Sequence, residues 1–330
     1  MPKSITRRAV LNGTANAGLL IAASSIAQAQ SGWPNKPITI VVSLPAGGLT
    51  DAIARVLGQY VSDTTGQQVL IVNKPGASGN IAAAQIARAP ADGYTFLFCL
   101  SSTLVQNRVM FKTLGFDPDK DFTIVSGMPA GPLPIVVHKS VPATNLKGLI
   151  EYARKNKVNF GSWALGSSAH VIAKSLNDKY GLSMEVVTYK GEAPMWQDMG
   201  AGLLQVAMGS PQAMNFLVAQ GDIRGIVIPS KVRAKLFPAV STAEEQGFTD
   251  DYYYGSGWFA LVAPAATPKG IIKRMSELWV AAAESEAGKK MMESFDLIEK
   301  PMQHEEVTAD YELLKKTAIP RILELGIKLD

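Results

Sequence analysis

The sequence has very few of the residues that build disulfide or metal sites. Its 330 residues include one cysteine, Cys99, and three histidines, His138, His170 and His304. A single cysteine excludes an internal disulfide framework and a cysteine-based zinc cage. The histidines are far apart and no HExxH pair occurs, which argues against a zinc site on one helix. We therefore expect no metal and no cofactor.

Charge is also sparse. Charged residues make up 18% of the chain and apolar residues 47%, the composition of a folded globular protein. The formal net charge of +4 comes mainly from the first 29 residues, which hold three basic residues and no acidic one. The remainder has 29 basic and 28 acidic residues. This near-neutral balance argues against nucleic acid as a partner, because its binding needs a concentrated basic face.

Beyond the N-terminus, no run of about 20 apolar residues occurs, so no membrane-spanning helix is expected. At the N-terminus, Arg7-Arg8 precede a short apolar stretch that ends in Ala27-Gln28-Ala29. These parts predict a signal peptide over residues 1–29 and a periplasmic protein. Residues 6–11 also resemble a twin-arginine signal, with Val10 where that pattern usually has Phe; an ordinary signal is the alternative. Cys99 lies in the apolar run 94–100, which predicts a buried strand.

Strands and helices alternate after residue 33. Strand-like runs at 38–42, at 69–72 and from Tyr94 flank helix-like segments at 53–61 and 81–88, and this βαβαβ order predicts a mainly parallel sheet. A Pro/Gly-rich segment, 129–134, precedes a second alternating series. That series predicts strands at 135–138, 159–163, 184–188, 204–208 and 225–228. We therefore predict an α/β protein with two lobes and two mainly parallel sheets joined by a hinge.

Four loops suit an anion-binding site. They span 45–51, 76–80, 164–170 and 189–192, and each places Gly or Ser before a predicted helix. Ligands of open α/β sheets bind where helices begin, and one helix N-terminus favours an anion by about 0.3–1 kcal/mol. A charge-assisted hydrogen bond adds about 1.5–3 kcal/mol, while micromolar affinity needs about 8.2 kcal/mol. Several loops must therefore converge on one ligand; the alternative for each loop is a plain turn and helix cap.

Catalytic motifs are absent. No G-x-S-x-G elbow, no P-loop and no G-x-G-x-x-G after a strand occurs. Ser167-Ser168-Ala169-His170 resembles a serine nucleophile with its base, but this spacing is more typical of a helix start, with Ser168 as the N-cap. The chain is therefore predicted not to be an enzyme. Asp51 either contacts a ligand or complements a helix dipole, and Trp163 and Trp196 either wall the site or pack in the core.

The same segments resemble the Bug-type family, the extracytoplasmic solute receptors of tripartite tricarboxylate transporters. The resemblance covers essentially the whole chain after the signal peptide. It rests on Trp33-Pro34, Pro45-Ala46-Gly47-Gly48-Leu49-Thr50-Asp51, Asn73-Lys74-Pro75-Gly76-Ala77-Ser78-Gly79-Asn80, Asp92-Gly93-Tyr94-Thr95, Gly166-Ser167-Ser168-Ala169-His170, Tyr189-Lys190-Gly191, Ala263-Pro264 and Thr267-Pro268.

This resemblance implies a two-lobed periplasmic binding-protein fold in which the chain returns to the first lobe. The division is then 30–131 with 255–330 for lobe one, and 132–254 for lobe two. The ligand is expected to be a small carboxylate, such as a dicarboxylic or aromatic acid, held by backbone amides, hydroxyls and water. The ligand-binding residues carried over are Ala46, Gly47, Gly48, Asp51, Asn80, Ser101, Ser102, Gly166, Ser167, Ser168, His170, Tyr189 and Gly191.

The predicted function is a periplasmic receptor that captures a small organic carboxylate between two lobes and delivers it to membrane transporter subunits. Three alternatives remain at this point. The first is an orphan receptor that reports its ligand to a sensor kinase. The second is an exported serine hydrolase using Ser167 or Ser168 with His170, and the third is a purely structural two-lobed module.

Overall fold

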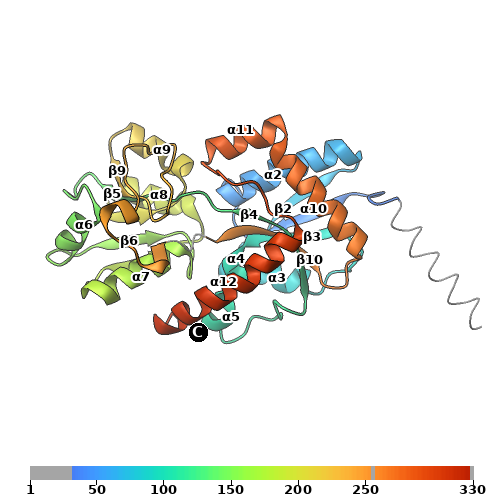
Figure 1. Cartoon of the computed structure of the whole chain (residues 1–330), viewed down its shortest axis with the longest axis horizontal. Coiled ribbons are helices and arrows are strands. Elements are labelled where there is room, and N and C mark those ends of the chain that lie inside the picture. The colour runs from blue at the N-terminus through green and yellow to red at the C-terminus, as the bar shows by residue number, and fades with distance from the viewer. Residues whose placement is uncertain (1–31, 254–256, 328–330) are drawn as a thin grey trace, which may run out of the picture.

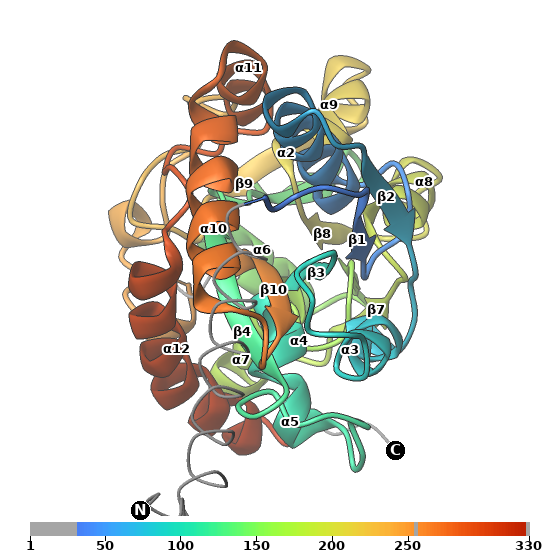
Figure 2. The ribbon, with the colours of Figure 1, turned by 90° about the vertical axis from the view of Figure 1, so that its right-hand side faces the viewer.

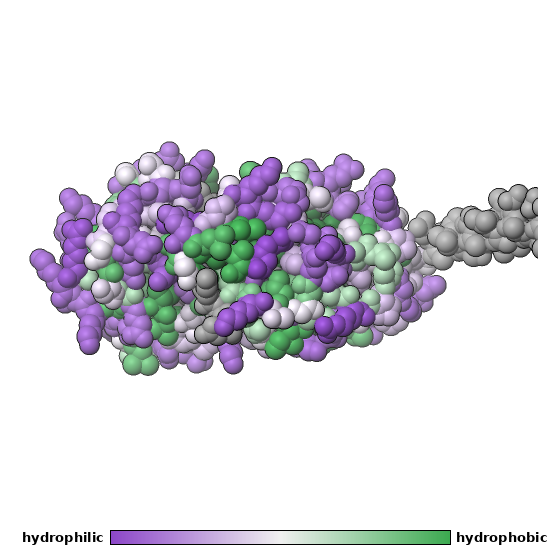
Figure 3. Space-filling view, turned by 90° about the horizontal axis from the view of Figure 1, so that it is seen from below, coloured by the Kyte–Doolittle hydropathy of each residue, from purple (hydrophilic) through white to green (hydrophobic). Residues whose placement is uncertain are grey.

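The computed structural model describes residues 32–253 and 257–327. The predicted signal peptide, residues 1–29, lies outside these residues, as does the predicted lobe boundary at 254/255. Within the described part, no helix is both long and apolar enough to cross a membrane. The face seen from below is mixed, with hydrophobic patches between hydrophilic residues (Figure 3).

The first sheet has the strand order β2-β1-β3-β10-β4. Its strands are β1 (Ile38–Val42), β2 (Val69–Asn73), β3 (Thr95–Leu100), β4 (Phe122–Pro129) and β10 (Trp258–Pro264). Strand β1 pairs in parallel with β2 and β3, whereas β10 is antiparallel to both β3 and β4. Four of the five strands therefore share one direction. Strand β10 comes from late in the chain, and it lies among strands of the N-terminal half (Figures 1 and 2).

The second sheet has the strand order β7-β6-β8-β5-β9. Its strands are β5 (Ile135–His138), β6 (Asn159–Ser162), β7 (Glu185–Thr188), β8 (Val206–Met208) and β9 (Ile223–Val227). Strand β6 is parallel to β7 and β8, and β5 is antiparallel to β8 and β9. We call each sheet with its covering helices a lobe: the first lobe holds the first sheet and the second lobe the second.

Helices cover both faces of each sheet. Their bounds are α2 (Leu49–Thr65), α3 (Asn80–Ile86), α4 (Ser101–Leu104), α5 (Asn107–Met110), α6 (Leu146–Ala153), α7 (Ser168–Tyr180), α8 (Glu192–Gly200), α9 (Pro211–Ala219), α10 (Lys269–Glu284), α11 (Glu286–Ser294) and α12 (His304–Glu324). In the first lobe, α2 and α10 pack on one face of the sheet and α3 and α12 on the other (Figure 2).

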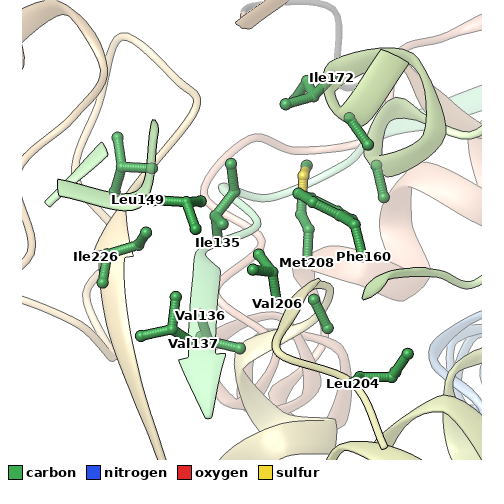
Figure 4. Close-up of a cluster of buried hydrophobic side chains, with 14 of the residues drawn as sticks. Ile135, Val136, Val137, Leu149, Phe160, Ile172, Leu204, Val206, Met208 and Ile226 are labelled. Carbon is green, nitrogen blue, oxygen red and sulfur yellow. The ribbon is translucent and has the colours of Figure 1, made fainter. Parts of the chain in front are cut away.

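Each lobe has its own hydrophobic core. In the second lobe, Ile135, Val136 and Val137 are all fully buried, because helices cover β5 on both sides (Figure 4). Such strands are continuous apolar runs, which is why the sequence pattern located them. In the first lobe, the prediction that Cys99 is buried is confirmed. Its thiol lies in β3, and burial raises its pKa far above the usual range.

The α/β class and the two mainly parallel sheets are confirmed, with one reversed strand in each sheet. Strand β4 was not predicted, because Ser126 and Gly127 interrupt its apolar run. Both small residues serve the packing of α12: Ser126 Oγ donates to the Met302 carbonyl, and a Cβ at Gly127 would lie 2.4 Å from Val307.

Candidate ligand-binding cleft

A cavity lies between the two lobes, with about 90 Å³ open to the centres of water molecules. This space fits several waters or one small organic molecule, since a single water needs roughly 10–15 Å³ on this measure. Residues of both lobes line it. Seven of the thirteen predicted binding residues are among them: Ala46, Gly48, Ser101, Ser102, Ser167, Ser168 and Gly191.

The first wall is the N-terminus of α2. Its N-cap residue, Gly48, has φ −87° and ψ 173°, and no side chain caps the helix. Gly48, Leu49 and Thr50 all line the cavity. Among the described residues, the Gly48 N–H has no protein acceptor. The first N–H groups of a helix have no intrahelical partner, so this terminus offers free donors and a partial positive charge to the cavity.

Asp51 fixes the loop before α2. Its Oδ2 accepts from the Gly47 N–H at 3.0 Å, and its Oδ1 accepts from Asn73 Nδ2 at 2.9 Å. Burial raises the pKa of this carboxyl, but hydrogen bonds from Arg55, Gly47 and Asn73 outweigh it and hold the pKa below its usual value. Asp51 is therefore ionised at neutral pH. Its hydrogen-bond partners lie in the loop (Gly47), in α2 itself (Arg55) and at the end of β2 (Asn73), so Asp51 orients the loop and does not line the cavity.

The second wall is the N-terminus of α8, in the other lobe. Its N-cap, Gly191, has φ 108°, a conformation that L side chains rarely adopt. Its N–H donates to the Trp163 carbonyl at 2.8 Å, and no side chain caps the helix. A Cβ at Gly191 would lie 3.6 Å from the Pro45 ring of the first lobe. The two uncapped helix starts therefore line the same cavity.

The third element at the cavity is the start of α7. The N-cap is Ser167 rather than the predicted Ser168, because Ser167 has the extended backbone that a cap requires. Its Oγ accepts from the His170 N–H at 3.4 Å and shares a hydrogen bond with Ser162 Oγ at 2.9 Å. Ser168 Oγ is thereby left buried without a partner, and it lines the cavity.

Gln106 of the first lobe also lines the cavity, and its Oε1 is likewise buried without a partner. Buried polar atoms are almost always hydrogen-bonded, so these two orphaned groups from opposite lobes need an explanation. A polar ligand in the cavity supplies one.

Within the described residues, the imidazole of His170 makes no hydrogen bond to the hydroxyl of Ser167 or Ser168. Its Nδ1 accepts from the Gly166 N–H at 3.3 Å, which ties the loop to α7. Burial, together with the charge of Lys174, lowers the pKa of His170 to about 4. The imidazole is therefore neutral at pH 7, and its acceptor nitrogen is already used. The arrangement lacks the bond between serine hydroxyl and imidazole that nucleophilic catalysis requires.

We expect His170 to make the fold sensitive to acid. Its pKa is lower in the folded chain than in the unfolded one, so the unfolded state takes up the proton first as the pH falls. The free energy of unfolding should decrease by about 2 kcal/mol between pH 7 and pH 5 through this group. Urea unfolding at both pH values measures the change. Asparagine in the variant His170→Asn can still accept from the Gly166 N–H but does not titrate, so the variant should lack the decrease in the free energy of unfolding that His170 causes. An unchanged pH dependence in the variant would show that His170 is not its source.

Six predicted residues do not line the cavity: Gly47, Asp51, Asn80, Gly166, His170 and Tyr189. Asn80 Oδ1 accepts from Asn107 Nδ2 at 2.6 Å, and the Tyr189 hydroxyl donates to Asp198 at 2.6 Å. Both side chains hold neighbouring elements of their own lobe. Ligand contact by any of the thirteen stays a prediction.

Several lining residues were missed by the sequence pattern. Gln106, Ala130, Leu133 and Phe259 lie outside the four loops predicted to bind an anion, and the folding of distant segments brings them to the cavity. The sequence left undecided whether Trp163 and Trp196 wall the site or pack in the core; in the structure, Trp163 lines the cavity. Trp196 is buried and donates to Glu192 Oε2 at 3.1 Å.

The model of the family described as tripartite tricarboxylate transporter family receptor matches residues 53–318. The chain belongs to this family of receptors. Protein BugT of Bordetella pertussis is 32% identical over 275 residues, which are 82% of this receptor and 84% of BugT.

Solved structures show the same fold. The R. palustris protein Rpa4515, solved with adipate, is 30% identical with a TM-score of 0.83, and the match covers 90% of this receptor and 99% of that chain. The periplasmic binding protein BugD is 24% identical with a TM-score of 0.81, covering 90% and 99%. The two-lobed periplasmic binding-protein fold implied by the sequence is therefore confirmed.

Proposed function

We propose that this receptor binds a small organic carboxylate in the cleft between its lobes, without transforming it, and presents it to membrane transporter subunits. The observation that carries the proposal is the meeting of two uncapped helix N-termini, α2 and α8, at one cavity between the lobes. They come from opposite lobes, so a ligand that bridges them stabilises the closed form.

Micromolar binding of an anion needs several hydrogen-bond donors at once. A helix N-terminus favours an anion by up to about 2 kcal/mol in a partly buried site, and each charge-assisted hydrogen bond contributes about 1.5–3 kcal/mol. At the upper end of these ranges, the α2 terminus, one hydrogen bond from its free N–H groups and one from the Ser168 hydroxyl together reach the roughly 8 kcal/mol of micromolar binding. Aliphatic and aromatic wall residues, among them Leu133 and Trp163, suit the carbon chain of such an acid.

In this proposal, the ligand contacts are the seven predicted residues that line the cavity, together with Gln106. Asp51, Asn80, His170 and Tyr189 position the loops that carry them. Residues 30–131 with 255–330 move as the first lobe against residues 132–254, and the signal peptide over 1–29 directs the chain to the periplasm. A related protein has been solved with adipate, which supports an organic acid as the ligand class.

A hydrolase role is disfavoured by the bond from the Gly166 N–H to His170, which occupies the base. Turnover of an ester panel, abolished by Ser167→Ala or Ser168→Ala, would support that role instead.

Thermal unfolding with a panel of aliphatic and aromatic mono- and dicarboxylates tests the proposal. A ligand at 100 times its Kd adds about 2.7 kcal/mol of stability, so at least one acid should raise Tm by several degrees. The corresponding neutral amides serve as controls and should not raise Tm. A panel in which no acid raises Tm would contradict the proposal.

A further inference from the structure

We infer that Glu192 sets the ligand class: the receptor selects a carboxylate whose other end carries a protonated nitrogen, over a dicarboxylate of the same length. This inference rests on the proposed function, since it concerns the same cleft. Glu192 is an acidic residue in the lining of a cavity whose α2 side suits an anion.

Glu192 is the first residue of α8, and it lines the cavity while remaining partly exposed. Its Oε2 accepts from Ser210 Oγ at 2.7 Å, from the Ser210 N–H at 3.1 Å and from Trp196 Nε1 at 3.1 Å. Its Oε1 accepts only from the shared Ser210 N–H, at 3.3 Å. One oxygen is therefore saturated, while the other retains capacity for a further donor.

The protein supplies no cation to Glu192. Among the described residues that line the cavity, only Lys190 and Glu192 carry charge. The Lys190 side chain is exposed and forms no hydrogen bond or ion pair within residues 32–253 and 257–327. In the same residues, no basic side chain forms an ion pair with Glu192. Burial raises the pKa of Glu192, and the bonds from Ser210 and Trp196 only partly offset it. A cationic ligand group satisfies this carboxylate.

The cavity is therefore polarised. The start of α2 and the unpartnered Ser168 hydroxyl suit a carboxylate, and Glu192 suits an ammonium group. A dicarboxylate would place its second negative charge beside Glu192, and like charges at close range repel. A ligand with one carboxylate and one protonated amine matches both ends.

A competing role for Glu192 is purely structural. Ser210 is the N-cap of α9, so the carboxylate also ties the starts of α8 and α9 together. The isosteric substitution Glu192→Gln separates the two roles, because glutamine keeps an acceptor for Ser210 and loses only the charge.

Isothermal titration at pH 7.5 compares matched pairs that differ only in the second end group: succinate with β-alanine, glutarate with 4-aminobutyrate, and adipate with 5-aminopentanoate. For the chain length that binds, the native protein should prefer the amino acid by at least tenfold. The Glu192→Gln variant should bind the amino acid at least tenfold more weakly than the native protein and the dicarboxylate more tightly.

The pH dependence of binding gives a second measurement. In the native protein, dicarboxylate affinity should rise as the pH falls toward the pKa of Glu192, with Lys190 still protonated. The Glu192→Gln variant should lack this rise.

Equal or tighter binding of dicarboxylates by the native protein would overturn the inference and leave the proposed function standing. A preference for amino acids that persists in Glu192→Gln would overturn it as well, since Glu192 would then not be its source. Failure of every carboxylate to bind would instead contradict the proposed function.

Discussion

Replacing Gly48 by proline should weaken carboxylate binding by roughly ten- to a hundredfold, the equivalent of one charge-assisted hydrogen bond of about 1.5–3 kcal/mol. Gly48 has φ −87°, close to the angle that proline imposes, so the ring should fit the backbone. What proline removes is the N–H of a cavity-lining residue, which has no acceptor within the described part of the chain. Isothermal titration with the best acid of the panel measures the loss.

Gly48→Ala is the matched control. A Cβ at this position would lie 3.8 Å from the Pro45 carbonyl oxygen, an ordinary contact, and alanine keeps the N–H. Its affinity should stay within a few-fold of the native value. If Gly48→Pro folds and binds as tightly as Gly48→Ala, the α2 terminus does not hold the ligand.

Gly166→Ala should lower ligand affinity by about tenfold or more through an effect on lobe closure. Gly166 has φ 70°, and a Cβ there would lie 2.2 Å from Met110 Cε of the first lobe. Met110 is 1% exposed and packs against Ile322, so it has little room to move away. The added methyl group should therefore push the lobes apart and disfavour the closed form that a bridging ligand needs. Titration gives the affinity, and small-angle scattering with ligand gives the degree of closure.

Gly181→Ala provides the control for backbone strain. Gly181 has φ 62° and ends α7, but no atom lies within 4 Å of a Cβ built there. A non-glycine residue in this conformation costs about 1–2 kcal/mol, so both variants should lose similar stability. Only Gly166→Ala should lose affinity. Equal affinities in the two variants would show that contact between residue 166 and Met110 does not govern closure.

Local sequence signals located most strands of the fold, with β4 as an exception, but they did not predict which distant strands pair. The runs at 38–42 and 135–138 are continuous apolar segments with β-branched residues, and both form strands as predicted. Strand β10 inserts antiparallel between β3 and β4, and its neighbours are more than 120 residues away in sequence. No periodicity encodes such a choice of partner.

Some residues of the candidate site could also be predicted from local sequence signals, and others could not. Glycine and serine at helix starts marked Gly48, Ser168 and Gly191 correctly as cavity residues, because a helix start is a local feature. Gln106 and Glu192 carry the most specific chemistry of the cavity, yet their exposure to it depends on how the lobes meet. The helix cap at Ser167 rather than Ser168 shows the limit of local signals: two adjacent serines are equivalent in sequence, and only the backbone angles distinguish them.

A crystal structure of the receptor with the tightest-binding acid of the panel tests the central claim most directly. The account predicts one carboxylate in the cleft between the lobes, with its oxygens about 2.7–3.2 Å from the backbone N–H groups at the start of α2 and from the Ser168 hydroxyl. A carboxylate bound elsewhere, or one in this cleft that contacts neither group, would contradict it.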